Sequence, residues 1–132
     1  MENEELVLEV PAVPAYIGTA RLFIGAVARH VGASEEQVDD LKVAVSEACT
    51  AAIRTRADAG NDGPVRVLVD LGDGRLTVEV PDAIARRPDR GAANTDELAR
   101  ELSAEIIRAL FPQAETRSPN GIAPIRFWLD LG

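Results

Sequence analysis

The sequence predicts a two-layer α/β sandwich, in which a mixed, mostly antiparallel sheet of four or five strands carries three main helices on one face. Three segments repeat apolar residues at helical spacing, and the segments around them alternate apolar and polar residues as half-buried strands do. One layer of helices on one sheet buries all of these apolar faces together. At 132 residues the chain is expected to form a single domain, residues 1–132.

In chain order, the first expected elements are a strand and two helices. The strand alternates glutamate and apolar side chains over Glu5–Val10, and a proline-rich segment ends it. The first helix covers residues 14–31, where apolar residues recur on one face until Gly32 supplies a stop signal. Ser34 begins a capping box, SEEQ, so a second helix is expected from there to about Thr55.

The second half of the chain is expected to give two hairpins around a third helix. Two alternating runs, at 65–71 and 75–80, form the first hairpin across the turn residues GDG. Residues 81–93 show no periodicity, so a surface loop is expected there. The third helix runs from Asn94 until Pro112 stops it, and an Asn-Gly turn closes the final hairpin. The buried stripe of the third helix is expected to comprise Leu98, Leu102, Ile106 and Leu110.

Charge and composition exclude several classes of function. Fourteen basic and twenty-two acidic residues give a net charge of −8, which opposes the attraction that drives nucleic-acid binding, so no direct nucleic-acid partner is expected. No apolar run approaches the roughly 20 residues of a membrane span. The N-terminus lacks the features of a signal peptide, and the one cysteine has no partner for an intrachain disulfide. A cytoplasmic protein without membrane contact is therefore expected.

Several reactive side chains have simple structural explanations. Cys49 lies beside the core stripe of the second helix, with no histidine or lysine within a turn, so a buried, unreactive thiol is expected. His30 has no second ligand at suitable spacing, so no metal site is expected. The arginines of the 81–93 loop either grip a phosphate or an acidic partner, or belong to a charged, solvated loop; they are Arg86, Arg87 and Arg90.

A carboxylate on the second helix is the main candidate for chemistry. Glu47, Ala51 and Arg54 follow one another at i, i+4 and i+7, so they share the helix face opposite the core stripe. Glu47 is then either a general base or a surface glutamate in a salt bridge. Spacing alone leaves both interpretations open.

Residues 10–53 carry the most specific signal in the chain, in the motifs VPAVPAYIG, ARL and LKVAVSEACT. This stretch resembles the N-terminal third of the RsbW-type anti-sigma-factor serine kinases, a branch of the histidine-kinase-like ATPases. The resemblance implies a sandwich of the Bergerat type, in agreement with the order of elements. It also implies partners: a sigma factor, and a STAS-domain anti-anti-sigma factor whose serine such proteins phosphorylate with Mg-ATP. A homodimer, common in this family, is expected as well.

Two of the family's nucleotide-binding boxes are matched only in part. In the first, Glu47 matches the general base toward the partner serine, whereas Ala51 stands where an asparagine coordinates Mg²⁺, and its methyl offers no oxygen. In the second, Asp82 matches the aspartate that reads the adenine amino group. Ile84 and Arg86 there replace two glycines that let the backbone approach the nucleotide.

The third box of the family is a glycine-rich phosphate cradle, which corresponds here to residues 99–110, ARELSAEIIRAL, without any glycine. The third helix is expected to continue through this segment, so that its backbone N–H groups form the hydrogen bonds of the helix and are not free to bind phosphate. The three differences together predict lost or weak ATP binding, with no cofactor expected. The alternative is an active protein-serine kinase that uses Mg-ATP, with Glu47 as base and Asp82 as adenine reader, and a third possibility is an adaptor for another client.

The first helix is where the resemblance places partner binding and the dimer contact. Arg21, in the motif ARL, is expected to be the main partner-binding residue, and Tyr16 a second one. The alternative for Arg21 is an ordinary exposed helix charge.

Overall fold

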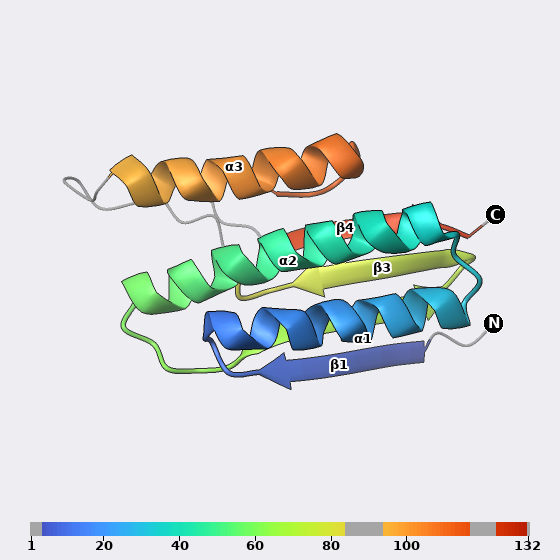
Figure 1. Cartoon of the computed structure of the whole chain (residues 1–132), viewed down its shortest axis with the longest axis horizontal. Helices are drawn as coiled ribbons and strands as arrows, with labels where there is room; N and C mark the ends of the chain where they lie inside the picture. The colour runs from blue at the N-terminus through green and yellow to red at the C-terminus, as the bar shows by residue number, and fades with distance from the viewer. Residues whose placement is uncertain (1–3, 84–93, 117–123, 132) are drawn as a thin grey trace.

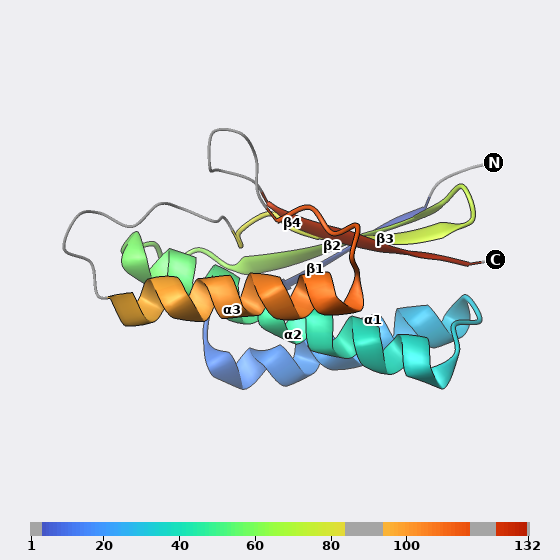
Figure 2. The ribbon, with the colours of Figure 1, turned by 90° about the horizontal axis from the view of Figure 1, so that it is seen from above.

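A four-stranded sheet forms one layer of the molecule and three helices form the other (Figure 1). The computed structural model describes residues 4–83, 94–116 and 124–131. Figure 2 shows that all three helices lie on the same side of the sheet, so the predicted two-layer sandwich is confirmed. The strands and helices, in chain order, are β1 (Glu4–Val10), α1 (Ile17–His30), α2 (Glu35–Asp58), β2 (Val65–Gly72), β3 (Arg75–Val80), α3 (Asn94–Leu110) and β4 (Ile125–Asp130).

The sheet has the strand order β1-β2-β3-β4, and every neighbouring pair of these strands is antiparallel. The helices α1 and α2 connect β1 to β2, whereas α3 connects β3 to β4. Of the predicted closing hairpin, the described residues show one antiparallel bridge, between Glu115 and Arg126. The Asn-Gly turn of that hairpin, and the predicted loop beyond Ala83, lie outside the described residues.

Local chemistry fixes the ends of these elements where the sequence predicts them. The Ser34 hydroxyl accepts a hydrogen bond from the backbone N–H of Gln37 at 3.1 Å. The Gln37 side-chain oxygen accepts one from the backbone N–H of Ser34 at 2.8 Å, which completes the capping box of α2. Gly32, with φ at +86°, ends α1. Asp73 and Gly74 both have positive φ, as a tight turn between β2 and β3 requires.

The core lies between the sheet and the helices, and α2 is its central helix, in contact with α1 on one side and α3 on the other. α3 turns a different face to this core than predicted. Its buried positions are Ser103 and Ile107, and Phe111 just beyond it packs on Phe127 of β4 with ring centroids 5.0 Å apart. The predicted stripe is largely exposed: Leu98, Leu102 and Ile106 face solvent, and Leu110 is half-buried.

The reason for this difference is that α3 lies against α2 with Ile107 in the core, and Phe111, four residues later, packs on Phe127 of β4. Periodicity shows that a helix has apolar faces, but it does not show which of two such faces meets the rest of the chain. Over the part of the chain that the structure describes, no helix is long and apolar enough to cross a lipid bilayer.

Candidate functional site

Asp82, two residues after β3, is a buried carboxylate held by two arginines. Arg56 donates from Nη2 to Asp82 Oδ1 at 2.6 Å. Arg66 donates to Asp82 Oδ2 from its backbone N at 2.8 Å and from Nε at 3.3 Å, and to Oδ1 from Nη2 at 3.2 Å. Hydrogen bonding to Asp82, reinforced by its charge, raises the pKa of Arg66. Both oxygens of Asp82 are therefore already engaged by the chain itself.

Arg56 reaches Asp82 from the C-terminal end of α2 because the chain folds back closely behind this helix. Gly60, with φ at +62°, lets the backbone leave the helix. Gly63 then passes so near the guanidinium that a β carbon there would lie 3.3 Å from Arg56 Cζ. Arg56 Nη2 also donates to the carbonyl oxygen of Pro64 at 3.0 Å. The loop after α2 thus holds the arginine against Asp82.

Glu47 lies where α2 meets α3, and its partner there is a neutral hydroxyl. Ser103 of α3 donates from Oγ to Glu47 Oε1 at 2.9 Å, and Ser103 is buried. Glu47 itself is half-buried, so the interpretation as a freely exposed surface glutamate is wrong. One carboxylate oxygen of Glu47 is committed to a serine of the same chain.

Ala51, one turn further along α2, belongs to the hydrophobic core and is only 5% exposed. The prediction that Glu47, Ala51 and Arg54 lie on the helix face opposite the core is wrong for Ala51. The reason is that α1 and α3 flank α2 on both sides, so α3 covers the flank on which these residues lie. Arg54 is accordingly half-buried.

The segment that corresponds to the phosphate cradle is an uninterrupted helix. α3 includes all of residues 99–110, so their backbone amides are engaged within the helix, as the sequence predicts. Ile84 and Arg86, the positions of the second box, lie outside the described residues, as do Arg87 and Arg90.

Comparisons with known proteins agree with this architecture. Residues 10–123 match the model of the histidine kinase-like ATPase domain. A serine-protein kinase RsbW of Bacillus pumilus is 32% identical over 128 residues, which cover 87% of this chain and 79% of that protein. The chain belongs to the RsbW-type histidine kinase-like ATPases. The proteins of the same name from Bacillus velezensis and Bacillus subtilis are 40% and 39% identical over 75 residues, which are 57% of this chain and 47% of each relative.

The described residues of this RsbW-type chain fit Mg-ATP poorly. A Mg²⁺ ion requires oxygen ligands in near-octahedral geometry, and Ala51 presents a buried methyl at the ligand position. An adenine amino group at Asp82 would have to displace the guanidinium of Arg56 or Arg66. At Glu47, one oxygen is already bound to a serine of α3. Among the described residues, Ala51, Asp82 and Glu47 thus offer no complete set of free donors and acceptors for Mg-ATP.

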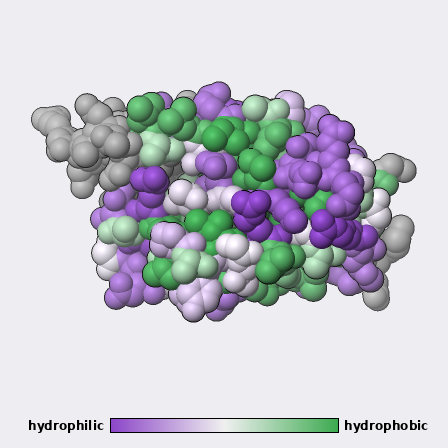
Figure 3. Space-filling model, viewed as in Figure 1, coloured by the Kyte–Doolittle hydropathy of each residue, from purple (hydrophilic) through white to green (hydrophobic). Residues whose placement is uncertain are grey.

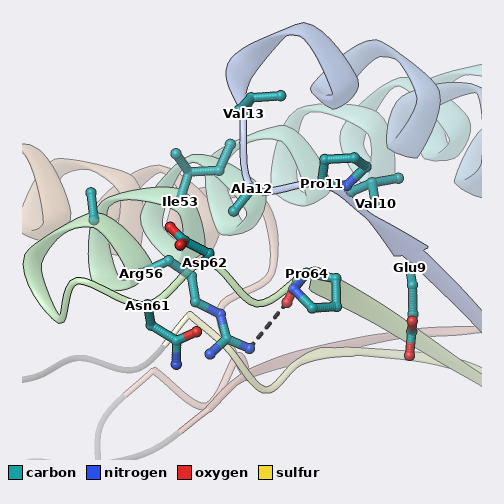
Figure 4. A pocket seen from close by; sticks show the side chains of 11 residues that line it. Glu9, Val10, Pro11, Ala12, Val13, Ile53, Arg56, Asn61, Asp62 and Pro64 are labelled. Atoms are coloured by element: carbon teal, nitrogen blue, oxygen red, sulfur yellow. Dashed lines mark hydrogen bonds between the residues drawn. The ribbon is translucent and has the colours of Figure 1, made fainter.

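A pocket of about 640 Å³ lies where the end of β1 meets the loop after α2 (Figure 4). Its wall is largely apolar and includes Val13 and Ile53, and Figure 4 shows the guanidinium of Arg56 turned toward Pro64 at the other side. Asp82 does not line this pocket. Arg56, which donates to Asp82, does line it, so the cavity borders the Arg56–Asp82 ion pair of this RsbW-type chain.

Both residues that the sequence suggests for partner binding are exposed. Arg21 of α1 is exposed, and Tyr16, directly before this helix, is 42% exposed. Cys49 is buried as predicted, and burial raises its pKa to about 12. His30 is exposed at the end of α1. Within the described ranges, no three histidine, cysteine or acidic side chains gather in a group that could hold a metal ion.

Three residues at the site were not anticipated from the sequence: Arg56, Arg66 and Ser103. The two arginines lie on opposite sides of the loop after α2, and spacing along the chain does not indicate that both meet Asp82. For Ser103 a signal did exist. It is a small polar residue in the middle of an amphipathic helix, and once its face is known to be buried, it requires a hydrogen-bond partner.

Proposed function

We propose that this chain is a regulator of the anti-sigma-factor type that captures its protein partners without depending on bound ATP. The partners are a sigma factor, a STAS-domain anti-anti-sigma factor or both, and the complex forms in the cytoplasm, where sigma factors act. Family membership and the resemblance of residues 10–53 support these partner classes. The observation that carries the loss of ATP dependence is the ion pair between Arg56 and Asp82.

Energetics oppose nucleotide binding at Asp82. Removing one partner of a buried ion pair costs about 3–5 kcal/mol. A hydrogen bond from a neutral amino group to the same carboxylate contributes only about 1.5–3 kcal/mol. Displacement of Arg56 from Asp82 by adenine is therefore unfavourable by about 0–3.5 kcal/mol, and the middle of this range, about 1.7 kcal/mol, weakens binding roughly twentyfold. The buried Ala51 removes a metal ligand in addition.

The partner surface in this proposal is α1. Arg21 supplies a positive charge on the outer side of the helix, and Tyr16 adds an exposed aromatic ring near its start. Arginine and tyrosine are enriched at the energetic centres of protein interfaces. Self-association of the chain through the same helical region is part of the proposal, as the family resemblance suggests.

Calorimetric titration with Mg-ATP and with ADP tests the nucleotide part of the proposal. We expect no binding heat at millimolar nucleotide, whereas micromolar affinity would overturn it. The variant Arg56→Ala is the informative companion, because it leaves the Asp82 carboxylate with one arginine fewer. A gain of nucleotide affinity in this variant identifies Arg56 as the obstacle.

Pull-down with purified sigma factor and anti-anti-sigma factor tests the partner part. Arg21→Glu is expected to lose capture while its circular dichroism spectrum stays unchanged. Arg29→Glu, at the other end of α1, is the matched control and should retain capture. Equal capture by both variants would remove Arg21 from the interface.

An active protein-serine kinase is the second candidate function. It is favoured by the relatives, which are named serine-protein kinases, and by the presence of Glu47 and Asp82 at the matching positions. Such an enzyme would use Mg-ATP and keep Glu47 as general base. Transfer of labelled phosphate from ATP to the anti-anti-sigma factor, lost in Glu47→Gln, would establish it in place of the proposal above.

A further inference from the structure

The outer face of α3 is an apolar stripe that nothing in the described chain covers. Leu98, Leu102 and Ile106 are 57%, 53% and 39% exposed, and they recur at i, i+4 and i+8 on one side of the helix. Figure 3 shows hydrophobic side chains gathered along α3, at the top of the view. A contiguous exposed stripe of this kind marks an interaction surface more often than three scattered apolar residues would.

The stripe continues onto α2. The hydrogen bond between Ser103 and Glu47 sets these two residues at the same level of the helix pair, and α2 and α3 run in opposite directions (Figure 1). Val43 lies four residues before Glu47 on α2, and Ile106 lies three residues after Ser103 on α3. Because the helices are antiparallel, Val43 and Ile106 lie beside each other, about one helical turn from the Ser103–Glu47 hydrogen bond. Val43 is also exposed. The two helices thus present one apolar surface, defined here as Val43, Leu98, Leu102 and Ile106.

Acidic side chains border this surface. Glu101 of α3 and both Glu36 and Asp39 of α2 are exposed, and Glu105 is exposed beside Arg108, with which it forms an ion pair. The whole chain carries a net charge of −8. An occupant that adds positive charge around an apolar stripe is therefore favoured, and an acidic occupant is opposed.

We propose that this surface docks a basic amphipathic helix, whose leucine-like side chains meet the stripe while lysine or arginine residues face the acidic border. Helix-in-groove recognition of this type uses anchors at i, i+3, i+4 and i+7. A second copy of this chain is a poor occupant of this surface, because it would place two acidic borders against each other. Leu102 and Ile106 lie in the segment that corresponds to the phosphate cradle, but they are exposed on an uninterrupted helix. The surface does not include α1, so its test is separate from the test of partner capture through Arg21.

Fluorescence anisotropy with a labelled synthetic peptide tests this proposal. The probe is a helix of about 14 residues built from leucine and lysine, about 21 Å long, and the control peptide has glutamate in place of lysine. We expect saturable binding of the basic peptide and none of the acidic one. Leu102→Asp should weaken binding at least tenfold, whereas Leu22→Asp, at a 72% exposed leucine of α1, should leave it unchanged.

A second variant, Ile106→Asp, guards against a local folding defect, and both α3 variants are compared with the parent chain by circular dichroism. Equal affinity of the Leu102→Asp and Leu22→Asp chains would mean that the peptide senses only the net charge, and would overturn the proposal. So would binding of the acidic peptide, or absence of binding by the parent chain. If sedimentation shows a dimer that Leu102→Asp converts to a monomer, the occupant is a second copy and the proposal is wrong.

Discussion

Arg56 Nη2 lies 2.6 Å from Asp82 Oδ1, and this contact joins the end of α2 to the turn after β3. The carboxylate that reads adenine in the family thereby serves this chain as an anchor between its two layers. Arg66 extends the anchor to β2 from the same carboxylate. A residue that matches a ligand-binding motif can thus be retained for structural reasons, and its presence alone does not establish binding.

Asp82→Asn is expected to lower the free energy of unfolding by about 3 kcal/mol, chiefly because the largely buried Arg56 loses its compensating charge. Arg66→Ala is the control. Its side chain is 44% exposed against 19% for Arg56, so its removal should cost about 1 kcal/mol or less. Urea unfolding followed by circular dichroism measures both changes. Similar, small losses for the two variants would contradict the role of Asp82 as an anchor.

Ala51→Asn is expected to destabilise the chain by about 1–3 kcal/mol without restoring nucleotide binding. The reason is that the amide would enter the core, where its polar atoms lack partners. Ala57→Asn, at an exposed position near the end of α2, is the matched control and should cost about 0.5 kcal/mol from helix propensity. Thermal unfolding and calorimetry on the same samples measure the two effects. Recovered nucleotide affinity at unchanged stability would show that Ala51 alone had removed the site.

The buried thiol of Cys49 is expected to lower the free energy of unfolding at alkaline pH. Burial raises the pKa of its thiol to about 12, above the value of about 8.5 for an unfolded chain. The unfolded state therefore releases a proton first as the pH rises. The stability contributed by the neutral thiol is complete below about pH 8.5 and declines toward pH 12, by up to about 1.4 kcal/mol per pH unit.

Urea titrations of the parent chain and of Cys49→Ala between about pH 7 and pH 10 isolate this effect. The variant loses some packing at every pH, so the informative quantity is the difference in slope, and the parent should fall more steeply. A thiol reagent provides an independent control, since the folded chain should react far more slowly than the chain in urea. Parallel pH profiles together with fast labelling would show that Cys49 is accessible.

The fold could be predicted from the sequence because its boundaries rest on local chemistry. The Ser34 capping box, the stop at Gly32 and the turn at Asp73 and Gly74 each involve residues a few positions apart, and each is present as predicted. The orientation of α3 could not be predicted in the same way. It depends on the burial of Ile107 in the core and on the contact of Phe111 with Phe127. Local sequence patterns do not show that these two aromatic residues, which belong to different elements, come together.

Helical spacing alone marks Glu47 as a candidate base, and the family resemblance predicts the rest of the candidate site only in part. The resemblance indicated which positions match the base and the adenine reader, namely Glu47 and Asp82. It did not indicate their present partners, because Arg56 and Asp82 are 26 positions apart and Ser103 and Glu47 are 56 apart. Such pairings follow from the packing of whole elements, so they become visible once α2, α3 and β3 are placed.

Substitutions on the buried and the exposed face of α3 are expected to differ in their effect on stability, without any ligand. Ile107 is fully buried, so Ile107→Ala should lower the free energy of unfolding by about 2–5 kcal/mol through lost burial and a residual cavity. Leu102 is exposed, so Leu102→Ala should change it by less than about 0.5 kcal/mol, since alanine also has high helix propensity. Urea unfolding of both variants distinguishes the two orientations of the helix. The reverse order of losses would mean that the leucine stripe faces the core, and the docking surface on α3 would then not exist.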